Sequence, residues 1–133
     1  MTSELRVDNL KGSTTGGSIN VLGEGTSATT NLQQGLAKSW AKVVYSGGTP
    51  SSTDSINISS YNDDGTGIYD ANFTNVMSSS DYSASGMSIN NTRVLTYNTF
   101  SSSFLEFKVY NVGVSATTLS DNDSSFDIHG DLA

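Results

Sequence analysis

The single histidine of the chain, His129, could serve in metal binding or in acid–base catalysis. It stands between Asp127 and Asp131, where polar and apolar residues alternate, so we expect it on the outward side of a closing strand. One histidine excludes a metal site built from a histidine pair within one chain, and a Ser-His-Asp triad would depend on it alone. Two interpretations stay open: a solvated strand residue, or a residue that meets its copies on a three-fold axis and shares an ion with them.

The 13 carboxylates are the next candidates for chemistry. Glycoside hydrolysis needs two carboxyl groups across the scissile bond, one of them kept protonated by its surroundings. Almost all carboxylates here fall in expected turns or on polar strand faces. We therefore assign no catalytic residue and expect no enzymatic activity, with polysaccharide cleavage kept as an alternative.

Two acidic turns, at 62–65 and 121–124, carry the oxygen ligands that Ca²⁺ prefers. Neither fits the twelve-residue EF-hand loop, and the chain has no cysteine for a thiolate site or a disulfide. Acidic turns are also common without metal. We therefore expect no metal site and no cofactor.

Loops on a rigid β scaffold often carry recognition, and tyrosines beside them offer flat, amphipathic contact surfaces. The same aromatic side chains could instead close the ends of the core. The loops we consider span 49–54, 62–65, 98–102 and 119–125. The candidate binding residues in or beside them are Asp54, Tyr61, Asp63, Asp64, Tyr97, Phe100, Asp121 and Asp123.

The elements that must position these residues are predicted to be strands. Ser, Thr and Asn supply 51 of the 133 residues and Gly another 13, which suits strands with a wet outer face joined by many turns. Residues 35–133 show seven or eight short alternating segments, which predict an all-β, antiparallel β-sandwich or jelly-roll-like domain. The segment 32–42 could be helical, but its β-rich continuation favours a strand. The expected strands lie at 36–45, 56–59, 69–74, 82–89, 93–98, 104–110 and 126–132.

One expected strand has two usable faces. Leu105, Phe107 and Val109 form a continuous apolar face, while the opposite face is mixed, with Phe104 and Tyr110 at its ends. Such a strand should be covered on both sides, either in the centre of a sandwich or at an interface between subunits.

Residues 1–34 form a thinner section, in which large apolar residues are much sparser than in the rest of the chain. We expect two short strands, at 5–7 and 19–21, and a linker at 23–30. So few apolar residues cannot offset the entropy of ordering the section, so it needs partners. The alternatives are an intertwined segment shared between copies and a flexible tail. The candidate interface residues are Leu5, Val7, Ile19, Val21, Phe104 and Tyr110.

The formal net charge of −7 argues against several partners. A chain that tracks nucleic-acid phosphates or an anionic bilayer would carry a basic patch, and none is visible. No apolar run approaches the roughly 20 residues of a membrane span. We therefore expect neither nucleic-acid binding nor membrane insertion.

Several segments, in order, resemble a domain that recurs at the ends of phage tail fibres, especially of marine phages. They are Gly35-Leu-Ala-Lys-Ser-Trp-Ala-Lys, Asp54-Ser-Ile-Asn-Ile-Ser-Ser, Asp63-Asp-Gly-Thr-Gly-Ile-Tyr-Asp-Ala-Asn-Phe-Thr, Met77 with Asp81-Tyr82, and His129-Gly-Asp. The resemblance covers about 100 residues of the body. It implies a mostly β homotrimer mounted on the virion and facing the host, and it supplies no catalytic residues.

The resemblance gives the function that we expect: a trimeric tail fibre, or fibre tip, of the virion. Its partners would be its own copies, other virion tail proteins, and a host cell-surface receptor, either a glycan or an outer-membrane protein. The alternatives are a capsid or tail decoration protein that binds other virion proteins, and a polysaccharide-cleaving spike.

Overall fold

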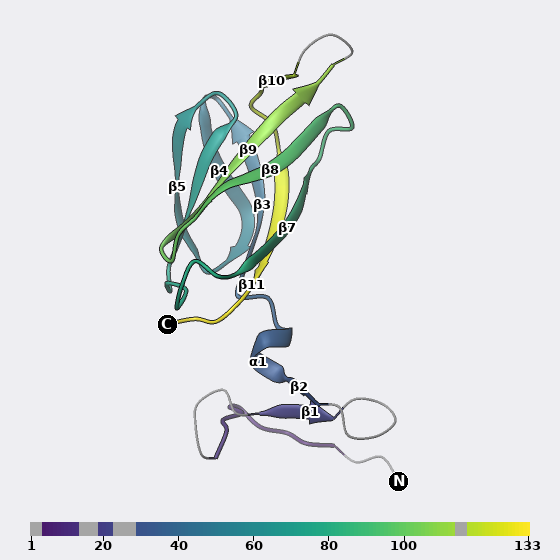
Figure 1. Ribbon diagram of the computed structural model, residues 1–133, viewed down its shortest axis with the longest axis vertical. Coiled ribbons are helices and arrows are strands. Elements are labelled where there is room, and N and C mark those ends of the chain that lie inside the picture. Colours follow the sequence, from purple (N-terminus) through teal and green to yellow (C-terminus); the bar gives the residue numbers. More distant parts are fainter. Residues whose placement is uncertain (1–3, 14–18, 23–28, 114–116) are drawn as a thin grey trace. The chain divides into compact units, whose positions relative to one another are not determined.

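The computed structural model describes residues 4–13, 19–22, 29–113 and 117–133 (Figure 1). The chain divides into two compact units, Met1–Leu36 and Ala37–Ala133. Within the described ranges, no helix is long and apolar enough to cross a membrane.

The described residues of the first unit form one small antiparallel pair. Strand β1 (Asn20–Leu22) pairs with β2 (Thr29–Asn31), and a single helical turn, α1 (Leu32–Gly35), follows. The backbone N–H of Leu32 donates to the carbonyl of Ile19 at 2.8 Å, which ties this turn to the start of β1.

Three expectations for this stretch were wrong. Residues 4–13 contain no strand, so Leu5 and Val7 do not alternate in one. The end of the expected linker forms β2 instead. The stretch from residue 32 begins as a helical turn, and the strand expected to start at residue 36 starts at Ser39.

The second unit is all-β, and every strand pair in it is antiparallel, as the sequence predicted. One sheet has the order β4-β3-β11-β7, and the other contains β5, β6, β9, β8 and β10. A jelly roll is a more specific strand arrangement than an antiparallel all-β fold, and it stays a prediction. The strands are β3 (Ser39–Ser46), β4 (Thr49–Ile56), β5 (Ile58–Gly65), β6 (Ile68–Phe73), β7 (Ser83–Ser88), β8 (Arg93–Phe100), β9 (Phe104–Val112), β10 (Thr117–Leu119) and β11 (Ser124–His129).

Strand β9, the two-faced strand of the sequence, has neighbours on both edges. β8 pairs along nearly its whole length, and the opposite edge is shared by β6, over 104–108, and β10, over 110–112. Leu105, Phe107 and Val109 are fully buried, while Phe104 and Tyr110 on the other face are partly buried. The apolar face of β9 thus lies against the second sheet.

A chain of aromatic rings joins the two sheets through the core. Tyr45 of β3 lies 5.6 Å from Tyr69 of β6, Tyr69 lies 5.4 Å from Phe107 of β9, and Phe107 lies 5.5 Å from Phe126 of β11, measured between ring centroids. Tilted ring contacts at such distances stabilise beyond the area that they bury. The chain crosses between the sheets twice and fixes how they face each other.

The polypeptide changes sheet at Asn57, which has φ of 60°. Asparagine tolerates this left-handed conformation better than other side-chain-bearing residues. Its side-chain oxygen accepts the N–H of Asn75 at 2.7 Å, and its amide donates to the Asn75 carbonyl at 3.0 Å. The single strand expected through Ile56 and Ile58 is therefore wrong, because β4 and β5 meet at a corner here.

Pro50 was expected in a loop and is instead a buried residue of β4. Proline lacks the N–H needed for pairing on both sides, so it is found on edge strands. Strand β4 is such an edge, paired only with β3.

Truncation of Phe107 should destabilise the sandwich severely. Phe107→Ala removes the ring that contacts both Tyr69 and Phe126, and a large-to-small core change of this kind costs about 3–5 kcal/mol. Urea unfolding measures the loss. Asp81→Asn, at an exposed loop position, serves as the control and should change stability by less than about 0.5 kcal/mol.

Alkaline pH should unfold the protein through its tyrosines. Burial raises the pKa of Tyr82 to about 12 and raises the pKa values of Tyr69 and Tyr97 still further. These pKa values exceed the value of about 10 in an unfolded chain, so the folded state favours neutral tyrosine. The unfolding free energy should then fall as pH rises above about 10.

Phenolate absorbance during a pH titration checks this expectation. At least these three of the six tyrosines should ionise only as circular dichroism reports unfolding. Ionisation of all six before any loss of structure would contradict it.

Candidate functional site

The structure scatters the predicted binding residues over three places. The far end of the sandwich, defined by the β3–β4, β5–β6 and β7–β8 turns and residues 120–123, lies opposite the end where β3 begins and β11 finishes (Figure 1). Asp54 and Phe100 belong to the near end, and Tyr61 and Tyr97 lie within strands. The far end holds Asp63, Asp64, Asp121 and Asp123.

Two of the far-end carboxylates hold the chain together. Asp121 accepts hydrogen bonds from the N–H of Gly67 at 2.6 Å and the hydroxyl of Tyr69 at 2.7 Å. Asp123 accepts the N–H of Tyr45 at 2.9 Å. These bonds connect residues 121–123 to both sheets. The two carboxylates therefore have a structural role that the sequence did not predict.

The acidic turn expected at 62–65 is the end of β5, and the chain reverses after it at Thr66 and Gly67. Asp63 accepts the N–H of Gly65 at 3.0 Å and the hydroxyl of Tyr45 at 3.3 Å. Asp64 is exposed. Of the four far-end candidates, Asp63 and Asp64 are exposed, whereas Asp121 and Asp123 are half-buried.

Tyr61 and Tyr97 pack against the core, and both hydroxyls are buried without a hydrogen-bond partner among the described residues. This is the alternative considered from the sequence, in which aromatic side chains close the core. Asp54 is exposed and accepts the N–H of Ser55 at 2.9 Å. Phe100 lies with its ring centroid 5.1 Å from that of Tyr82.

A hollow of about 550 Å³ lies at the far end, and most of its lining residues were not candidates from the sequence. It is bounded by Ile89, Asn90, Asn91, Asn122 and Asp123, and only Asp123 was a candidate. Asn122 donates to the Ser88 hydroxyl at 2.7 Å, so part of this polar lining is fixed.

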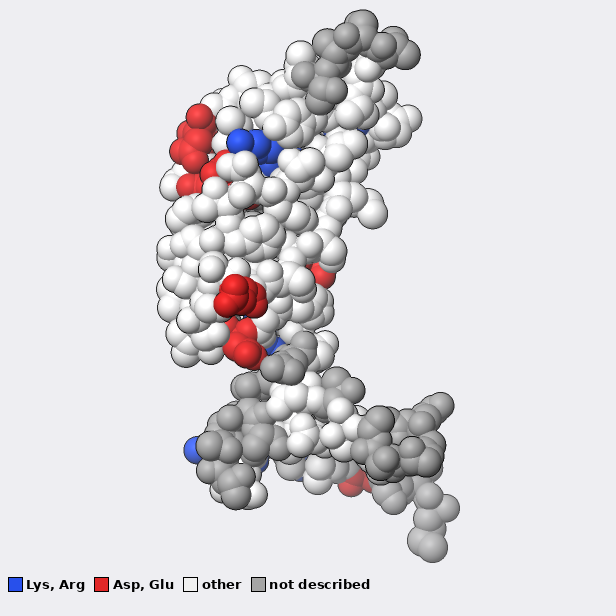
Figure 2. Space-filling view, in the orientation of Figure 1, with Lys and Arg blue, Asp and Glu red and all other residues white. Residues whose placement is uncertain are grey.

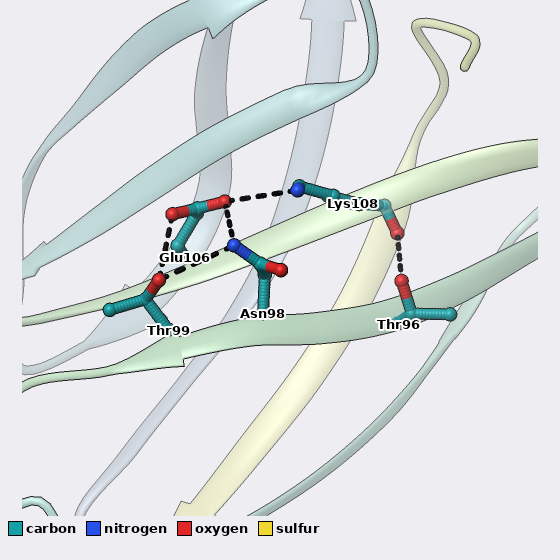
Figure 3. Close-up of polar contacts among 5 residues, drawn as sticks. All are labelled: Thr96, Asn98, Thr99, Glu106 and Lys108. Atoms are coloured by element: carbon teal, nitrogen blue, oxygen red, sulfur yellow. Dashed lines mark hydrogen bonds and ion pairs between the residues drawn. The ribbon is translucent and has the colours of Figure 1, made fainter.

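The outer face of the larger sheet carries a polar network centred on Glu106 (Figure 3). One carboxylate oxygen of Glu106 accepts from Asn98 at 2.6 Å and lies 3.6 Å from the Lys108 ammonium; the other accepts from Thr99 at 2.9 Å. Asn98 is the residue at which the β8–β9 register shifts. The network therefore fixes this bulge and holds the carboxylate in place.

Asp70 stands directly opposite Glu106 on β6. Desolvation, then the charges of Asp64 and Glu106, raise the pKa of Asp70. One of its oxygens is buried and has no hydrogen-bond partner among the described residues. Figure 2 shows acidic side chains in separate groups on this side of the molecule, one of them beside a basic group.

On the outer face of the smaller sheet, the sequence singled out His129 but not the residues around Trp40. Trp40 of β3, Asp127 of β11 and Ser85 of β7 lie in one cross-strand row. Asp127 accepts from the Ser85 hydroxyl at 2.8 Å, and His129 Nε2 lies 3.1 Å from its other oxygen. A hollow of about 480 Å³ lies over this row.

His129 thus has a partner on its own strand. The described residues contain no group of three or more His, Cys, Asp or Glu side chains that could hold a metal ion. Whether copies of His129 meet on a three-fold axis stays a prediction.

The candidate interface residues of the first unit are largely exposed. Leu5, Val7 and Val21 are 77%, 54% and 50% exposed, and Ile19 is half-buried. Phe104 and Tyr110 lie on the outer face of β9, on the second unit.

No protein-family model, curated protein or solved structure matches the chain. The residues of the chain itself therefore carry the functional inference.

Replacing Asp70 should stabilise the protein at neutral pH. Its raised pKa means that the folded state binds the proton more tightly than the unfolded state, so stability is lost as pH rises through the carboxyl range. Asp70→Asn removes a like charge opposite Glu106 and should gain roughly 0.2–1 kcal/mol at pH 7.

Urea unfolding at pH 7 and at pH 4 measures the difference between Asp70→Asn and the wild type. The gain should shrink at the lower pH, because a larger fraction of Asp70 in the folded wild type is protonated there. An equal gain at both values would show that its charge is not the cause.

Proposed function

We propose that the protein is a trimeric, non-enzymatic attachment protein of a phage particle, a tail fibre or the tip of one. The observation that carries the proposal is the contrast between its units. The sandwich buries a continuous core, whereas the described apolar side chains of the first unit are mostly exposed. The exposed ones are Leu5, Val7, Leu10, Val21, Leu22 and Leu36.

The contrast supports assembly through the first unit. Each large apolar side chain brought from water into an interface contributes about 1.5–3 kcal/mol. Copies arranged in a closed ring supply that interface with one repeated contact. We therefore assign the trimer contacts first to the exposed apolar side chains of residues 4–13 and 19–22.

The sandwich then presents its far end and outer faces to the host. Three copies of a weak site gain avidity at a surface that repeats its receptor. The segment order resembles that of phage fibre tips, which agrees with this arrangement. The formal net charge of −7 also agrees with it, because it disfavours nucleic acid as a partner.

The mass in solution tests the assembly. Sedimentation equilibrium of the full chain should give three times 14.0 kDa. Replacing Leu5, Val7 and Val21 together by Ser removes apolar contact area and should shift the mass towards one chain, with the circular dichroism of the sandwich unchanged.

Val76→Ser is the matched control, since Val76 is 44% exposed but belongs to the sandwich, and it should leave the trimer intact. A wild-type mass of one chain would overturn the proposal. Adsorption of the trimer to host cells separates attachment from decoration: a decoration protein would bind purified virions and leave the cells unlabelled.

A further inference from the structure

The hollow over the smaller sheet combines apolar and polar surface in one place. Trp40 of β3 and Met87 of β7 supply its apolar lining, and Ile56, half exposed, stands beside Trp40 in the sheet. Lys42, Ser85, Ser125 and Asp127 supply polar groups. The volume, about 480 Å³, is within the range of small-molecule sites.

The polar groups are set before any ligand arrives. Ser85 and His129 each hold one oxygen of Asp127, so its carboxylate cannot turn freely. Each oxygen keeps a lone pair for a further donor. Lys42, exposed in the next row of the sheet, offers N–H donors to the same hollow.

This combination suits a sugar ring. A pyranose has one face of C–H groups, which can lie on an indole, and hydroxyl groups at its edge that both donate and accept. The fixed carboxylate of Asp127 can accept hydrogen bonds from these hydroxyl groups, and the ammonium group of Lys42 can donate to them. The hollow thus offers a platform for the face of the ring and partners for its edge.

The charged side chains around the hollow favour a neutral sugar over an anionic one. Lys42 is the only Lys or Arg among the residues that line the hollow, and it is accompanied by Asp127 there and by Asp54 opposite it on β4. The chain as a whole carries a formal net charge of −7. A phosphate or a polyanionic glycan would be repelled, whereas a neutral glycan meets no such cost.

We propose that the outer face of β3, β11 and β7 binds a neutral sugar residue, stacked on Trp40 and hydrogen-bonded to Asp127. The inference rests on the proposed attachment function and names the chemical class of its receptor: neutral glycans of the host surface.

Trp40 is the only tryptophan of the chain, so its fluorescence reports on this site alone. The full chain is titrated with neutral oligosaccharides of glucose, galactose, mannose and N-acetylglucosamine up to about 10 mM, where weak single-site binding is visible. At least one should give a saturable change in emission. Polygalacturonate, a polyanion, should give none.

Ligand-observed NMR with the sugar that binds then tests the residues. Trp40→Ala removes the platform and should weaken binding roughly tenfold or more. Asp127→Asn keeps the shape but loses the charged acceptor, and should weaken binding by a similar factor. Val94→Ala, on the other sheet, and Asp81→Asn, in an exposed loop, are the matched controls and should bind as the wild type does.

The inference is overturned if no neutral sugar changes the emission, if the polyanion binds instead, or if Trp40→Ala, shown to be folded, binds as well as the wild type. The two proposals fail separately. If the chain binds a sugar but never adsorbs to cells, the sugar site is supported and the proposed attachment function is wrong. If Trp40→Ala still adsorbs to cells, the attachment function is supported, and the receptor must bind another surface of the protein.

Discussion

The packing of two sheets through a continuous line of aromatic rings is the constraint on which the second unit depends. Tyr45 and Phe126 come from one sheet and Tyr69 and Phe107 from the other, so the order of the rings fixes both the separation of the sheets and their relative alignment. With the inner faces committed in this way, every alternate residue of each strand is turned outward. The outer faces are then free to carry polar networks without cost to the core.

The two outer faces use this freedom differently. On the larger sheet, Glu106 is held by partners from its own strand and from β8. Its carboxylate therefore stabilises the bulge in β8. On the smaller sheet, Ser85 and His129 each hold one oxygen of Asp127, which lies beside an indole and an open hollow. Polar groups are common to both faces, and the second face brings Trp40 together with them in a hollow.

The sequence predicted the features that depend on alternation alone. Leu105 and Phe107 could be assigned to the core, because a period of two marks the buried face of a strand. The corner at Asn57 could not be predicted, since one residue in a left-handed conformation leaves the alternation on either side intact. The grouping of Trp40 with Asp127 was also out of reach, because it depends on the register between strands far apart in the chain. Alternation also does not show which face of a strand points inward. For this reason Tyr61 and Tyr97 were candidates for receptor binding, although they pack against the core.

The chain enters and leaves the sandwich at one end: Ser39 of β3 pairs with Ile128 of β11, next to the last residues (Figure 1). The turns at the opposite end therefore bear none of the covalent connection to the rest of the chain. Loops in such positions accept insertions at a small entropic cost, because each doubling of loop length adds only about 0.6 kcal/mol. The scaffold can thus acquire new sequence at that end over evolution, or by engineering, while its connection to the first unit stays unaltered.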